Sequence, residues 1–317
     1  MKKGTIISAV ILTVLGLALA GGALAIAGFD FSKLDTVKYE TNTYTADDIF
    51  DKIEITSKET DIVFKPSTDG RLSAVCVERE KVKHNVSVEN GTLKITAEDN
   101  RKWYDHLGIF SKALSMTVYL PSGEYEALKI NCRTGDVLIG DPFAFKSAEI
   151  TASTGDVSCS NLLSDTLLVK TSTGDIKLDK VSAGTIDLTV TTGDITAGEI
   201  NCEDILSVKV GTGRTNLTDV TCKSLISSGN TGDIVLKNTI ASERFNIERG
   251  TGDVRFERCD AGEITVKTNT GDVTGTLLSE KIFVAKTSTG SVKVPETTSG
   301  GVCKITTSTG DIKISIS

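Results

Sequence analysis

One column of carboxylates is the first feature of this sequence that could carry chemistry. If equivalent aspartates stack about 4.8 Å apart in a repeat, their like charges repel, and a cation such as Ca²⁺ would relieve that repulsion. Calcium-binding solenoids supply several oxygen ligands per turn, whereas each turn here offers one carboxylate beside a threonine. We therefore expect these aspartates to bond backbone amides, and treat them only as weak metal candidates. They are Asp136, Asp156, Asp175, Asp194, Asp233, Asp253, Asp272 and Asp311.

Thiols and imidazoles offer little further chemistry. The chain has seven cysteines and two histidines, His84 and His106, and no two cysteines form a Cys-x-x-Cys pair. A zinc site or another bound cofactor is therefore not expected. The odd number and irregular spacing of the cysteines also argue against a disulfide framework, and we predict buried free thiols.

An enzyme would need a local break in the repeat that gathers an acid, a base and charge-stabilising groups in one groove. The breaks in the pattern are Arg214, Ser227, Arg249 and Ser291, and they are scattered along the chain without a pair of carboxylates. We therefore predict no catalytic residues, and a polysaccharide-binding or polysaccharide-cleaving parallel β-helix remains the alternative. A net charge of −7 with both signs interspersed argues against nucleic acid as a partner.

The carboxylates belong to an internal repeat. The tripeptide Thr-Gly-Asp recurs every 19 or 20 residues, always with Thr before the glycine and with Asp after it except at Arg214 and Ser291. A sharp bend between two strands needs a positive φ, which glycine adopts without penalty. The repeated glycines are Gly135, Gly155, Gly174, Gly193, Gly213, Gly232, Gly252, Gly271, Gly290 and Gly310.

Apolar and polar residues alternate on both sides of each repeated glycine. Val157 and Cys159 follow Gly155, for example, and Ala148 and Ile150 precede it. A period of two predicts two short strands per coil, and stacked coils can close a core that one coil cannot. The parity also places the Thr before each glycine inward, which argues against a flat ice-binding array of outward threonines. The sequence predicts an all-β, single-stack β-solenoid of about 19–20 residues per coil and roughly ten to twelve coils.

The first residues differ from the rest. Lys2 and Lys3 precede an uncharged run over residues 4–29, which is long enough for one transmembrane helix, although a cleaved signal peptide is the alternative. The lysines favour a cytoplasmic N-terminus over residues 1–3. We therefore expect a single-pass cell-membrane protein with a linker over residues 30–48 and an extracellular C-terminal domain.

The expected solenoid has an irregular and a regular part. Over residues 49–122 we expect imperfect coils, including a strand, an Asn90-Gly91 turn and a strand, with a helical insertion over residues 100–115. Residues 123–317 form the regular repeats. Because the last coil carries no polar cap, we expect it to be an interaction site that pairs with a second copy or a partner.

These motifs resemble the bacterial family named "putative adhesin", a domain of unknown function. The strand–Thr-Gly-Asp–strand coils, the segment Val88-Glu89-Asn90-Gly91-Thr92-Leu93-Lys94-Ile95 and Val118-Tyr119-Leu120-Pro121 carry the resemblance, over roughly residues 49–317. It implies a β-strand repeat on a membrane or surface protein, with some members tied to envelope stress. It transfers no catalytic residue. We expect a non-enzymatic, adhesin-like surface module that contacts cell-wall polymer or a surface protein.

Overall fold

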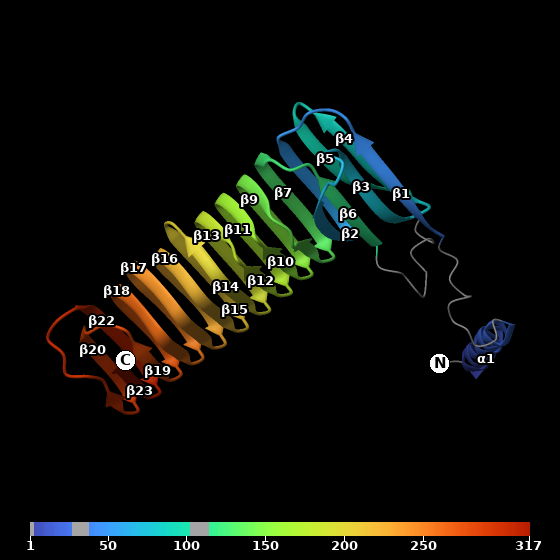
Figure 1. Cartoon of the computed structure of the whole chain (residues 1–317). Coiled ribbons are helices and arrows are strands. Elements are labelled where there is room, and N and C mark those ends of the chain that lie inside the picture. Colours follow the sequence, from blue (N-terminus) through green and yellow to red (C-terminus); the bar gives the residue numbers. More distant parts are fainter. Residues whose placement is uncertain (1–2, 27–37, 102–113) are drawn as a thin grey trace.

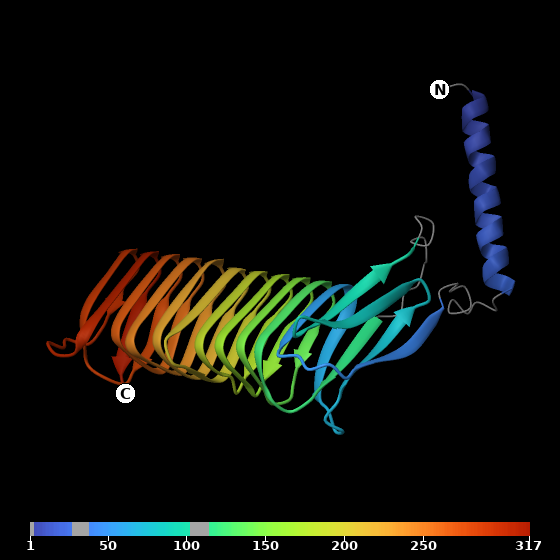
Figure 2. The same cartoon turned by 90° about the horizontal axis from the view of Figure 1, so that it is seen from above.

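The protein is a long single stack of β-coils, as expected. The computed structural model describes residues 3–26, 38–101 and 114–317. Over these residues one helix, α1 (Lys3–Ile26), is followed by 23 strands that join in one hydrogen-bonded sheet system. Figures 1 and 2 show the coils stacked in a row, with β1–β6 at one end and β18–β23 at the other.

The strands fall into two groups. Those at the N-terminal end are β1 (Tyr39–Ala46), β2 (Lys52–Pro66), β3 (Leu72–Arg79), β4 (Val82–Glu89), β5 (Thr92–Asp99) and β6 (Leu114–Leu120). Those of the repeats are β7 (Glu124–Thr134), β8 (Val137–Ile139), β9 (Phe143–Thr154), β10 (Val157–Ser160), β11 (Leu162–Thr173), β12 (Ile176–Asp179), β13 (Ser182–Thr192), β14 (Ile195–Cys202), β15 (Ile205–Thr212), β16 (Thr215–Thr231), β17 (Ile234–Thr251), β18 (Val254–Thr270), β19 (Val273–Leu277), β20 (Lys281–Thr289), β21 (Val292–Lys293), β22 (Gly301–Thr309) and β23 (Ile312–Ile316).

Each repeat pairs in parallel with the equivalent residues of its neighbours. Leu167 lies opposite Ile186, and Val157 lies opposite Ile176. The inward residues of the alternating pattern are almost completely excluded from solvent, so one hydrophobic core runs along the stack. The period of two therefore predicted both the strands and the buried face correctly.

The corner glycines have the predicted conformation and a second requirement. Their φ angles run from +127° to +148°. A Cβ on Gly174 would also lie 2.1 Å from the carbonyl oxygen of Gly155 in the adjacent coil, so any side chain would collide with backbone. A second corner, six residues after the glycine, was not foreseen. It places non-glycine residues in the left-handed region, among them Asn161, Lys180 and Asn238.

The threonine before each glycine does not point inward. Thr154 and Thr173, for example, are exposed, because the strand has already begun to bend at that position. In three repeats a buried threonine instead lies two residues earlier, at Thr171, Thr268 and Thr307. Thr171 is 3% exposed, and its hydroxyl donates to the carbonyl oxygens of Gly155 and Thr173.

At the N-terminal end the spatial order differs from the chain order. Strand β2 lies between β5 and β6 on one side and β7 and β8 on the other, all in parallel. Strand β4 pairs antiparallel with β5, and β3 pairs antiparallel with β6 and β1. These antiparallel strands β1, β3 and β4 form a cap, so residues 49–122 are not simply imperfect coils. Strand β1 also lies within the expected linker over residues 30–48. Most of the expected helical insertion, residues 102–113, lies outside the described residues, and Leu114 begins β6.

At the opposite end the last coil of the chain is not the last layer of the stack. Strands β22 and β23 pair on one side with β18 and β19, and on the other with β20 and β21. Gly310 thus lies against Gly271, 39 residues earlier, and Gly290 lies against Gly310. The expectation of an open C-terminal coil is therefore wrong, because both edges of that coil are already hydrogen-bonded.

Helix α1 covers most of the apolar run, whose residues 27–29 lie outside the described part of the chain. Within the described residues, no helix meets the length and hydropathy required of a membrane span. The expected transmembrane helix is therefore without support from the structure.

Candidate functional site

The eight turn aspartates form a hydrogen-bonded ladder, with one break, along one exposed corner of the solenoid. The Oδ1 of each accepts the backbone N–H of the residue that follows the corner in the next layer, at 2.7–2.9 Å. The partners lie 19 or more residues away, so the bond joins coils rather than bracing a local bend. Asp61, from the first imperfect coil, extends the ladder to Asp136. Each carboxylate therefore has a structural role, and the absence of a bound metal stays a prediction.

The ladder is interrupted where Arg214 replaces aspartate. Its own N–H bonds Asp194, but it offers no carboxylate to the next coil. In the same coil Thr215 replaces the Val or Ile of its column and is completely buried. The residue after Arg214, Thr215, thus meets a second break in the sequence pattern, Arg249.

Arg249 reaches past one intervening coil to Thr215, which lies two layers away. It is 3% exposed, and its Nη2 donates to the Thr215 hydroxyl at 2.8 Å, 34 residues away in sequence. The space for this comes from Gly229, which lies between Val210 and Arg249 in adjacent strands. A Cβ on Gly229 would lie 1.7 Å from Nη1 of Arg249. The three residues Thr215, Gly229 and Arg249, which we call the arginine insert, are therefore adapted to one another.

The arginine insert is energetically costly. Among the described residues, neither Nε nor Nη1 of Arg249 has a hydrogen-bond partner, and the hydroxyl of the nearby Ser227 is also buried without one. Burial lowers the pKa of Arg249 to about 10, although the charge of Asp233 opposes that shift. A buried cation with unpaired donors normally marks strain or function rather than stability.

A surface groove lies beside the arginine insert. It has a volume of about 290 Å³ and crosses the strands of four coils. Glycines and polar side chains make up all of its lining except Val210. The lining residues are Lys209, Val210, Gly211, Ser228, Gly229, Asn230, Glu248, Arg249, Gly250, Lys267 and Asn269.

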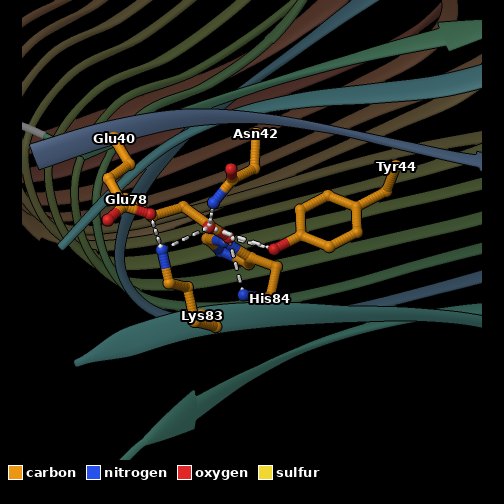
Figure 3. A network of polar contacts seen from close by, with 6 residues as sticks. All are labelled: Glu40, Asn42, Tyr44, Glu78, Lys83 and His84. Atoms are coloured by element: carbon orange, nitrogen blue, oxygen red, sulfur yellow. Dashed lines mark hydrogen bonds and ion pairs between the residues drawn. The ribbon is translucent and has the colours of Figure 1, made fainter. Parts of the chain in front are cut away.

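A second polar cluster lies inside the cap, around Glu78 (Figure 3). The side chain of Glu78 is completely buried, yet its carboxylate accepts hydrogen bonds from four donor groups, and the Tyr44 hydroxyl is shared between its two oxygens. Asn42 and Tyr44 of β1 donate from their side chains, and His84 of β4 donates from its backbone N–H at 2.6 Å and bonds through Nδ1 at 2.7 Å. Lys83 lies 3.8 Å away and bridges Glu78 to Glu40.

The electrostatics of the Glu78 cluster favour an ionised carboxylate. Burial opposes ionisation, but the hydrogen bonds from Asn42 and His84 outweigh it and hold the pKa of Glu78 below its ordinary value. Burial and the neighbouring Glu78 charge raise the pKa of Cys76 to about 12 and also raise the pKa of Tyr44. The thiol and the phenol therefore stay neutral, and Glu78 carries the charge.

The Glu78 cluster is also the one group in the described part of the chain with a metal-ligand composition. Ligand atoms of Cys76, Glu78 and His84 all lie within 4.8 Å of one another. However, the Glu78 oxygens are already saturated by donors, and the Lys83 ammonium would repel a cation. We therefore assign the cluster to fixing the register of β1, β3 and β4, a specificity role for buried polar groups.

Comparison with known proteins identifies the family of the chain. A family model described as Toastrack DUF4097 matches residues 50–205 and 198–317. The chain belongs to the Toastrack family. A search of curated proteins finds no match.

The chain is also similar to solved structures, at low sequence identity. A protein from Parabacteroides distasonis, named as a putative lipid binding protein, is 17% identical with a TM-score of 0.51, covering 76% of this chain and 98% of its own. One from Bacteroides fragilis, named as a putative adhesin, is 18% identical with a TM-score of 0.45, covering 88% of this chain and 97% of its own. At 17% identity the likeness to the Parabacteroides distasonis protein concerns the fold alone.

The buried positions of Glu78 and Arg249 in this Toastrack chain could have been inferred from the sequence. Glu78 has the inward parity of the alternating strand Leu72–Arg79, and a carboxylate at an inward position indicates a partnered buried charge. Arg249 likewise has inward parity, and a cation there needs an empty neighbour such as Gly229. What the sequence could not supply is which coil lies next to which.

Proposed function

We propose that this Toastrack protein is a non-enzymatic binding module of the cell surface, and that the groove beside the arginine insert contacts a cell-wall polymer. The groove itself carries the proposal. It is open to solvent, crosses four coils and presents the amides of Asn230 and Asn269 with the ammonium groups of Lys209 and Lys267. Such donors suit the hydroxyl, carboxylate and phosphate oxygens of a polysaccharide chain.

The solenoid supports this role mechanically. Parallel strands repeat about every 4.8 Å, and Asn230 and Asn269 stand two layers apart, so the groove presents an amide at every second layer to a long ligand. The lysine pair before the apolar run of residues 4–29 supports export of the solenoid, whether the segment is kept as an anchor or removed. The family resemblance to surface proteins agrees with that location. Accessibility of the solenoid to protease on intact cells would test it.

The binding experiment compares two substitutions in one outward column. Asn230→Leu removes a groove amide, and Ser172→Leu adds the same side chain to an exposed position three coils away. We expect wild-type full-length protein to be retained on purified insoluble cell walls, Ser172→Leu to bind equally, and Asn230→Leu to bind several-fold less. Wild type that is not retained, or equal binding by all three, would refute the proposal. Release of reducing sugar ends would favour the polysaccharide-cleaving alternative.

A further inference from the structure

The strand edges at the two ends of the solenoid differ in how they are covered. At the N-terminal end the outer edges of β5 and β6 are covered by the antiparallel strands β4 and β3. At the opposite end the outermost layer is β20 and β21, which pair only with β22 and β23 on their inner side. Among the described residues, no strand covers the outer edge of β20. The loop after β21 meets this strand at its first residue, where the Thr297 hydroxyl donates to the carbonyl oxygen of Lys281.

The side chains of this terminal layer are those of an uncovered core. Phe283 and Ala285 are only half-buried, whereas the equivalent Cys303 and Ile305 in the next layer are completely buried. On the outward face of the same strand, Val284 is 53% exposed. An edge with free backbone donors and acceptors beside exposed apolar side chains is a template for another strand.

We propose that the terminal layer pairs with the terminal layer of a second copy, β20 to β20, in antiparallel orientation across a two-fold axis at Val284. A two-fold axis makes the same surface serve both copies, and the antiparallel ladder it requires is the more stable arrangement. The proposal is independent of the wall-binding groove, which lies on other coils.

The sequence of β20 is self-complementary in this register. Pairing about Val284 places Phe283 opposite Ala285 of the second copy on the core side, so a large residue meets a small one. On the outward face Ile282 lies opposite Lys286 of the second copy, and Val284 meets itself. No lysine faces a lysine, and the pairing therefore extends the sheet without opposing like charges.

A cysteine at the proposed axis gives the test. Opposed residues in an antiparallel pair have Cα atoms about 4.5–5.5 Å apart, within the range that a disulfide spans. The seven native cysteines are all buried and unpaired, so an added surface thiol reacts alone. We would compare Val284→Cys with Ile240→Cys, which is 43% exposed on β17, well away from the terminal layer. Both are full-length proteins, oxidised at low concentration and read on a non-reducing gel.

The expected result is a chain dimer linked through residue 284, with little dimer for the Ile240→Cys control. Light scattering of the wild type should give the mass of two chains, and Val284→Lys, which opposes two ammonium groups at the axis, should give one. A monomeric wild type without a 284 link would overturn the proposal, as would equal linking of both variants. An adduct with a different protein on intact cells would overturn the second copy as the occupant.

Discussion

Replacing Arg249 by methionine should make the protein more stable, an unusual result for a buried residue. Methionine has a similar length and can fill the space above Gly229 without a charge. Replacement of a buried charge by an apolar side chain of similar volume is often neutral or stabilising. In this chain the guanidinium bonds Thr215 but leaves two donors unpaired within the described structure.

The magnitude follows from two opposing terms. The fall of the Arg249 pKa to about 10 corresponds to roughly 3 kcal/mol of disfavoured charge in the folded state. The lost hydrogen bond to Thr215 costs about 1–2 kcal/mol. The free energy of unfolding should therefore rise by about 1–2 kcal/mol, which raises Tm by about 2–4 °C. Arg249→Ala empties the same space and should be about 2–3 kcal/mol less stable than Arg249→Met.

A double-mutant cycle with Thr215→Val sharpens the test. In the wild-type background this substitution removes the one hydrogen-bond partner of the buried guanidinium and should lower the free energy of unfolding by about 1–3 kcal/mol. In the Arg249→Met background it removes an unpaired hydroxyl and restores the apolar column, so it should raise stability. Thermal unfolding of the four full-length proteins, with hydrogen exchange to localise the change to β15–β18, measures the cycle. A loss of stability in Arg249→Met, or the same sign for Thr215→Val in both backgrounds, would refute the reasoning.

Three further predictions concern the cap, the corners and the ladder. Glu78→Gln should destabilise the cap by about 2–4 kcal/mol at neutral pH, because the buried donors lose a carboxylate. Because the folded-state pKa of Glu78 is lowered, its contribution to cap stability is present above the unfolded pKa of about 4.5 and is lost as pH falls through the folded pKa. Hydrogen exchange of β3, measured against pH, should show this loss of protection in the wild type and not in the variant. Gly174→Ala should cost at least about 3 kcal/mol, because its Cβ would meet the Gly155 carbonyl at φ +132°, whereas Gly198→Ala, with 3.7 Å to its nearest neighbour, should change the unfolding free energy by less than about 1 kcal/mol. Chelator should leave Tm unchanged, since the ladder carboxylates already accept amides; a drop of more than about 10 °C would contradict that structural role.

The sequence by itself determined the repeating unit. Alternation around each Thr-Gly-Asp corner established two strands per coil and the inward residues, because a pleated strand with one buried face must alternate. The required glycine followed from its positive φ. The sequence also predicted the Asn90-Gly91 hairpin correctly, since both residues adopt the left-handed turn conformation that this pair favours.

Only the tertiary structure decided how the units are ordered and what lies between them. Similar coils present similar edges, so the sequence did not reveal that β22 and β23 lie between β18 and β19 on one side and β20 and β21 on the other. Nor did it reveal that β2 lies between β5 and β6 on one side and β7 and β8 on the other. For the same reason the partners of inward polar residues stayed hidden: Arg249 meets Thr215 two layers away, and Glu78 meets His84 across the cap. Short-range alternation sets which way a side chain points, whereas the neighbour it meets depends on which strand edges pair, a choice made over the whole chain.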